Sequence, residues 1–83
     1  MKTWWPEPVR VLIGSNTTYV VATNERAAEL LLGTEWPGSE SALHRKAREA
    51  ILRSMDKPDD PASARAARRA FEAAAREAGI LKE

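Results

Sequence analysis

Cysteine is absent from the 83-residue sequence, and histidine occurs once, at His44. Without cysteine the chain has no disulfide, no thiolate nucleophile and no sulfur-ligated zinc or iron–sulfur centre. A single histidine excludes a pair or triad of histidines within one chain. The sequence also lacks a glycine-rich phosphate loop and a nucleophile elbow. We therefore expect no enzymatic activity, no cofactor, no metal and no small-molecule ligand.

Long apolar runs and an excess of charge of one sign are missing too. No run approaches the roughly 20 residues of a transmembrane helix. The N-terminus passes from Lys2 into Trp4 without an apolar segment, so we expect no signal peptide and take a cytoplasmic location as the default. Thirteen basic and 12 acidic residues give a net charge of +1, which argues neither for nor against nucleic acid. The hydrophobic share of 43% is that of a globular domain.

The N-terminal part of the chain predicts a β-hairpin. Val9, Val11 and Ile13 recur at every second position, which is the period of a half-buried strand. A turn signal begins at Gly14, and residues 17–22 are rich in the β-branched and aromatic types that strands favour. Because a two-stranded hairpin is marginal by itself, we expect it to lie on the rest of the chain.

Two amphipathic helices are predicted next. Thr23 or Asn24 can cap the first helix, and Gly33 ends it. Apolar residues cover more than a third of its circumference, which indicates contact with both the sheet and another helix. Ser39 is the predicted N-cap of the second helix, with Glu40 in its first turn.

The third helix has the clearest start and stop signals. Asp60 as N-cap with Pro61 at the first helical position predicts its start, and Gly79 predicts its end after Ala78. Its alanines and Phe71 share one stripe about 100° wide, as in a helix docked on a core.

The order of these elements predicts an α+β fold in which an N-terminal β-hairpin packs on three helices. We expect an extended N-terminal segment over residues 1–8, where two prolines occur, and a single domain over residues 9–83. The residues predicted at the centre of the core are Leu31, Leu32, Trp36, Ile51 and Phe71.

Several short motifs occur in a fixed order along the chain. They are Pro8-Val9-Arg10-Val11, Ala27-Ala28 with Leu31-Leu32, Trp36-Pro37-Gly38, Ala64-Arg65, Ala70-Phe71, Ala74-Ala75 and Glu77-Ala78-Gly79-Ile80. In this succession the chain resembles the DUF982 family, small proteins of unknown function found mostly in alphaproteobacteria. The resemblance spans about residues 8–80 and implies a fold and a bacterial origin. The family has no established activity, so the resemblance assigns no catalytic or binding residue.

His44 is the only residue that suggests a metal site. Glu40 and His44 stand four apart and could touch one ion, but two ligands are too few for a structural or catalytic centre. We interpret His44 as a boundary residue hydrogen-bonded to its neighbours. A pH-sensing or metal role across a dimer axis is the alternative.

Tryptophan and alanine supply the candidate contacts for a protein partner. Trp4 and Trp5 point opposite ways on an extended chain, so one ring can cover the core while the other is exposed. Ala66, Ala70 and Ala73 extend a second alanine surface that starts at Ala62, on the far side of the third helix from its core-facing stripe. Such a surface is either a homodimer seam or a consequence of the helix propensity of alanine.

Arginine supplies the candidate contacts for nucleic acid. Arg65, Arg68, Arg69 and Arg76 lie along the third helix, but Glu72 pairs with two of them at a spacing of four. No aromatic residue is interleaved to stack on bases. The sequence thus favours a non-catalytic interaction module that self-associates or binds another protein, and a nucleic-acid-binding regulator is the alternative.

Overall fold

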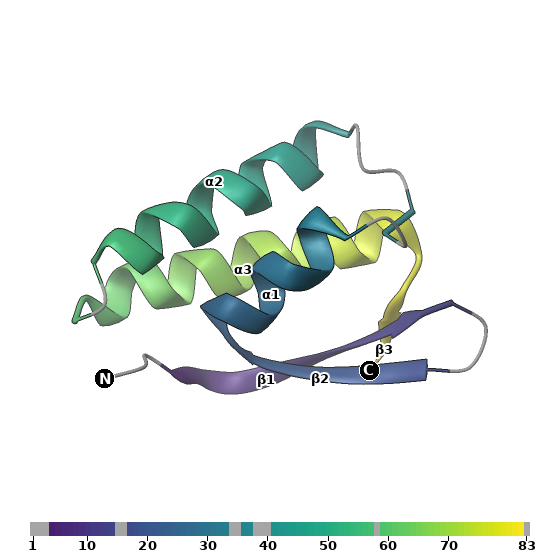
Figure 1. The fold of residues 1–83 in the computed structure, drawn as a ribbon, viewed down its shortest axis with the longest axis horizontal. Helices are drawn as coiled ribbons and strands as arrows, with labels where there is room; N and C mark the ends of the chain where they lie inside the picture. The colour runs from purple at the N-terminus through teal and green to yellow at the C-terminus, as the bar shows by residue number, and fades with distance from the viewer. Residues whose placement is uncertain (1–3, 15–16, 34–35, 38–40, 58, 83) are drawn as a thin grey trace.

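The computed structural model describes residues 4–14, 17–33, 36–37, 41–57 and 59–82. Along the chain its elements are β1 (Trp4–Ile13), β2 (Thr17–Thr23), α1 (Asn24–Leu32), α2 (Ala42–Asp56), α3 (Pro61–Ala78) and β3 (Leu81–Lys82). The helices lie on one side of an antiparallel sheet with strand order β2-β1-β3, and α2 and α3 pack along each other (Figure 1). The predicted α+β class, a hairpin followed by three helices, is confirmed.

The hairpin has the predicted alternation. Val9, Val11 and Ile13 are buried toward the helices, and Arg10 between them is exposed. The β1–β2 register is regular from Ile13 opposite Thr17 as far as Val9, and it is irregular between Val9 and the start of the strand.

β1 begins at Trp4, five residues earlier than the Val9 start that the alternation predicts. The irregular stretch between them contains Pro6 and Pro8. Proline has no N–H to donate to a ladder and is therefore confined to bulges and edges of sheets. The same prolines that obscure the strand in the sequence explain why its pairing is broken there.

The third strand was not predicted. Gly79 ends α3 with a left-handed φ of 76°, which glycine adopts without steric cost, and turns the chain back toward the sheet. The Ile80 N–H donates to the Ala75 carbonyl at 3.0 Å, and the Ile80 carbonyl accepts from the Leu12 N–H at 2.8 Å. Leu81 then pairs with β1, so the end of α3 is tied directly to the sheet.

The predicted caps of α1 and α3 are confirmed, and that of α2 is wrong. The Thr23 hydroxyl accepts from the Arg26 N–H at 3.2 Å, and the Asp60 carboxylate accepts from the Ala62 N–H at 3.1 Å. At α2 the cap is Ser41, whose hydroxyl accepts from the His44 N–H at 3.1 Å. Either of two serines can cap a helix, and here the later one does; Ser39 and Glu40 lie outside the described residues.

The centre of the core is aromatic and aliphatic, as predicted for four of five residues. Leu31, Ile51 and Phe71 are 1%, 0% and 0% exposed, and Trp36 is 4% exposed. The Phe71 ring lies between two tryptophans, with its centroid 5.4 Å from that of Trp36 and 5.5 Å from that of Trp5.

Leu32 is the error in the predicted core, because it is 65% exposed. The buried stripe of α1 runs through Asn24, Ala27 and Leu31, and Leu32 lies about 100° further round the helix. Leu32 therefore projects from the side of α1 rather than into the core. No helix in the described ranges is both long and apolar enough to cross a membrane.

Candidate functional site

An apolar groove lies between α1 and α2. It is lined by Ala28, Leu31, Leu32, Arg48, Ile51 and Leu52, and we refer to these residues as the α1–α2 groove. Leu31 and Ile51 are buried and form its floor, whereas Leu32 and Leu52 are 65% and 55% exposed and form its rims. Met55, which follows Leu52 by three positions on α2, is 40% exposed.

Buried hydrogen bonds hold one end of the α1–α2 groove. Asn24, the first residue of α1, accepts from the Trp5 indole N–H at 2.9 Å and donates to the Ser54 hydroxyl at 2.8 Å. All three side chains are buried, at 4% exposure or less. Because such bonds are strong in a low-dielectric interior, this chain fixes the start of α1 against both β1 and α2.

His44 holds the other end. Its Nε2 lies 2.8 Å from the Leu31 carbonyl oxygen, so Nε2 is the donor. That carbonyl belongs to the last turn of α1, where the helix leaves carbonyls without an internal partner. The ring also packs on Trp36, with centroids 5.8 Å apart. The prediction that His44 is hydrogen-bonded is confirmed, but His44 is buried rather than at the boundary, and its partner lies on α1 rather than among its neighbours in α2.

These contacts show the relative direction of α1 and α2. The start of α1 meets the end of α2 at Ser54, and the end of α1 meets the start of α2 at His44. The two helices are therefore antiparallel, and the α1–α2 groove runs between them. In the described part of the chain, no group of three or more His, Asp or Glu residues could hold a metal ion.

Both helices place charged side chains near the α1–α2 groove, and Glu49 precedes Leu52 on α2 by three positions, as Glu29 precedes Leu32 on α1. On α1, Glu25 and Glu29 precede Leu32 by seven and three positions, so they share its side of the helix. On α2, Arg48 lines the groove, and its Nε atom is buried without a hydrogen-bond partner among the described residues. Arg45, one turn before Arg48, is exposed.

The predicted aromatic and alanine contacts do not form one surface. Trp5 is buried, so the prediction that it contacts a partner is wrong; its ring is the one that covers the core. The side chain of Trp4 lies outside what the structure describes. Ala66 is exposed, but Ala70 and Ala73 are only half-exposed, and Ala70 packs against the core.

The alanine surface lies beside α2 rather than on the far side of α3. Ala62 and Ala66 line a hollow together with Ala50 and Arg53 of α2. Part of the predicted homodimer seam therefore faces α2 of the same chain.

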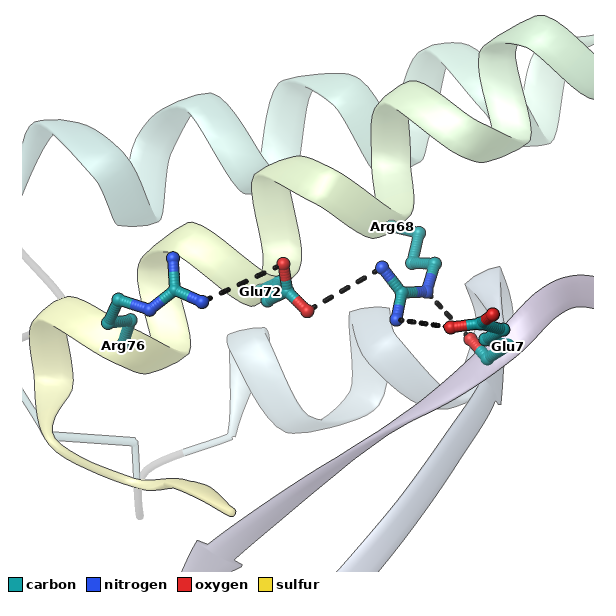
Figure 2. A network of polar contacts seen from close by, with 4 residues as sticks. All are labelled: Glu7, Arg68, Glu72 and Arg76. Atoms are coloured by element: carbon teal, nitrogen blue, oxygen red, sulfur yellow. Dashed lines mark hydrogen bonds and ion pairs between the residues drawn. The ribbon is translucent and has the colours of Figure 1, made fainter. Parts of the chain in front are cut away.

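The arginines of α3 are divided between structural and open positions. The Arg68 Nε–H donates to the Glu7 carbonyl at 2.7 Å, and its guanidinium lies 3.6 Å from the Glu72 carboxylate, which also pairs with Arg76 at 3.9 Å (Figure 2). Arg68 therefore bridges α3 and the irregular part of β1. The predicted pairing of Glu72 with both arginines is confirmed.

Arg65 and Arg69 are exposed and line an open hollow with Arg68, Pro6 and Glu7. Of the four arginines predicted to contact nucleic acid, Arg65 and Arg69 keep an open position beside β1, and Arg68 is held by contacts within the chain.

Comparison with known proteins identifies one family. The profile of the family described as "Protein of unknown function (DUF982)" matches residues 7–82. The chain belongs to the DUF982 family. No curated protein and no solved structure matches it. The resemblance predicted from the ordered motifs is confirmed, and this DUF982 chain inherits no activity from its family.

Sequence reasoning missed the α1–α2 groove of this DUF982 protein. It placed Leu32 in the core and did not consider Leu52 and Met55 as surface residues. A helical projection predicts that Leu52 is exposed. Ile51 lies on the buried face of α2, and Leu52 lies about 100° from it around the helix. The exposed leucines of α1 and α2 line one groove because α1 packs on α2, and a projection of either helix by itself does not show this packing.

Proposed function

We propose that this DUF982 chain is a non-catalytic protein-interaction module whose docking surface is the α1–α2 groove together with Met55. One observation carries the proposal. Of the large hydrophobic side chains exposed among the described residues, Leu32, Leu52 and Met55 come from α1 and α2, and only Val20 lies elsewhere, on β2. Exposed apolar residues scattered singly need no explanation, but a contiguous group marks an interaction site.

The shape of the groove supports a macromolecular partner rather than a small molecule. Its free volume is about 10 Å³, whereas ligand pockets occupy about 300–1,000 Å³. A shallow groove rimmed by two leucines suits an apolar side chain presented by a helix, which packs its apolar face between the rims. Leu31 and Ile51 form a buried, packed floor, so we expect docking to cost little reorganisation.

Site-specific crosslinking in the native host tests this proposal. A photoreactive amino acid is placed at Leu52, and the matched control carries it at Val20, which is 59% exposed on the sheet. We expect a discrete adduct from Leu52 that is absent from Val20 and is lost when Leu32→Glu is added. The absence of any adduct from Leu52 and from Met55 would contradict the α1–α2 groove as a docking surface.

A second candidate is binding to nucleic acid, favoured by Arg65 and Arg69 beside Arg68 in one open hollow. It predicts binding of duplex DNA or RNA whose affinity falls steeply with salt, because cations displace the protein from phosphate. Arg65→Glu with Arg69→Glu should abolish that binding, while Arg10→Glu on the exposed side of the sheet should retain it. Absence of binding by the unmodified chain at low salt would reject this candidate.

A further inference from the structure

We propose that the partner in the α1–α2 groove is a second copy of this chain, with α1 of each copy lying across α2 of the other. The inference rests on the proposed function, since it takes the same groove as the docking surface. It adds the identity of the occupant and the geometry of the pair.

The antiparallel packing of α1 and α2 makes such a pair possible. A two-fold axis that lies in the interface, between the two helices and parallel to them, places α1 of the second copy over α2 of the first. Because rotation about that axis keeps the direction of each helix, every α1 then runs antiparallel to the α2 beneath it. The same patch is used on both copies, which is the rule for two-fold dimers.

Charge complementarity favours a second copy. Glu29 of α1 is exposed and lies three positions before Leu32, and Arg48 of α2 lines the groove. Glu29 lies two positions before Leu31, and Arg48 lies one turn after His44, the residue that bonds to Leu31. The two residues are therefore at similar heights along the groove, and the two-fold axis brings Glu29 of one copy to Arg48 of the other.

Arg48 lines the groove and is half-buried, so in the dimer its guanidinium would lie beside the Glu29 carboxylate of the other copy. Within one copy, Glu29 pairs with Arg26 at 3.0 Å through a single carboxylate oxygen, Oε2. Both side chains of that pair are largely exposed, at 65% and 47%. Exposed ion pairs contribute little, so the Glu29 carboxylate is available to a second arginine.

The other two-fold arrangement is electrostatically worse. If the axis ran perpendicular to the helices, α1 would face α1 and α2 would face α2. With the axis at the height of Glu29 and Arg48, each of these residues would then approach its own copy, and like charges placed together oppose association. The structure thus favours α1 on α2 over the alternative pairing.

The dimer should be weak. A standard interface takes about 800 Å² from each partner, and this chain exposes 5265 Å² in all. Only three large apolar residues, Leu32, Leu52 and Met55, stand exposed on α1 and α2 in the described part of the chain. We expect association in the micromolar range, so molar mass must be followed from about 1 μM to about 1 mM.

Charge exchange tests the geometry. Glu29→Lys and Arg48→Glu each break both contacts of a dimer of like copies, and we expect each to weaken self-association at least about tenfold. Mixing the two variants restores a charge pair, because the lysine introduced in one variant meets the glutamate introduced in the other. Sedimentation of the mixture should therefore show a heterodimer. Independent monomers in the mixture, with both variants folded by circular dichroism, would overturn the proposal.

Crosslinking keeps the proposal testable should Arg48→Glu not fold. The chain has no cysteine, so Glu29→Cys and Arg48→Cys introduce single reactive thiols. A short bismaleimide should join the two variants to each other faster than either to itself. Preferential self-joining of Glu29→Cys would overturn the arrangement, and a monomeric unmodified chain at every concentration would overturn the second copy as the occupant. If that monomer still formed a Leu52 adduct with another protein, the docking surface would stand.

Discussion

Asn24 and His44 show how single polar residues position an apolar surface. Each lies at one end of the α1–α2 groove, is 3% exposed, and bonds to another element. A buried polar group that loses its partner costs about 1–3 kcal/mol. These two positions therefore couple the stability of the fold to the shape of the groove.

At Asn24 we predict a large effect of removing the amide. Asn24→Ala leaves both the Trp5 indole N–H and the Ser54 hydroxyl without their buried partner. The free energy of unfolding in urea should fall by about 2 kcal/mol or more. Glu77→Ala, at an exposed position of α3, is the control and should change it by less than about 0.5 kcal/mol. Equal stability of the two variants would show that the chain of hydrogen bonds is not important.

At His44 the prediction separates the hydrogen bond from the ring. His44→Phe keeps an aromatic ring against Trp36 but removes the donor to the Leu31 carbonyl. We expect a loss of about 1–3 kcal/mol in urea unfolding, and faster hydrogen exchange in the last turn of α1. A variant as stable as the unmodified chain, with unchanged exchange, would contradict the capping role.

At the scale of elements, helices α1 and α3 are specified by local sequence, whereas the sheet depends on distant residues. The N-terminal half of β1 contains two prolines and has irregular pairing, and Arg68 of α3 binds its Glu7 carbonyl (Figure 2). A guanidinium donor thus takes the place of a strand partner for that carbonyl.

Removing this bridge should loosen β1. Arg68→Ala deletes the bond to the Glu7 carbonyl and the ion pair with Glu72, and hydrogen bonds to charged groups contribute about 1.5–3 kcal/mol. We expect a loss of about 1–2 kcal/mol and a red-shifted Trp5 contribution to fluorescence. Arg69→Ala, its exposed neighbour, is the matched control. The bridge has no structural role if both variants unfold at the same urea concentration.

The cap of α3 should give the fold a pH dependence. The Ser63 hydroxyl, at 2.7 Å, lowers the pKa of Asp60 below its ordinary value of 3.8, and the Ala62 N–H adds to this. Because the folded-state pKa is lower, Asp60 stabilises the fold above its unfolded-state pKa. That contribution is lost as the pH falls through the folded-state pKa.

Asp60→Asn measures this contribution, since asparagine also caps helices but does not titrate. The melting temperature of the unmodified chain should fall more steeply on acidification than that of Asp60→Asn. The melting temperatures of the two proteins should therefore converge at low pH. Parallel pH profiles from about pH 6 to about pH 2 would rule out the titration of Asp60 as a source of stability.

These elements also show what the sequence could predict. The caps at Thr23 and Asp60 and the stop at Gly79 were predictable because the signal and the structure lie within one turn of helix. The strand β3 was not, because two residues carry no alternation and pair only after α3 has docked. Neither the exposure of Leu32 nor the hydrogen bonds of Asn24 are visible before α1 packs on α2, and the α1–α2 groove depends on both.

At the scale of the whole molecule, the helices cover one side of the sheet, and the large apolar side chains exposed among the described residues lie either on β2 or on α1 and α2. Val20 is a single residue on the sheet, whereas Leu32, Leu52 and Met55 are gathered on α1 and α2. The pair Val20 and Leu52, 59% and 55% exposed, therefore compares a solitary apolar residue with one at the proposed interface.

The most direct test is the molar mass of the unmodified chain, Leu52→Glu and Val20→Glu, measured by light scattering over a common concentration series. We predict that the unmodified chain and Val20→Glu pass from monomer to dimer together, while Leu52→Glu remains monomeric with an unchanged circular dichroism spectrum. A dimer that survives Leu52→Glu and dissociates with Val20→Glu would contradict the account, because association would then occur through the sheet.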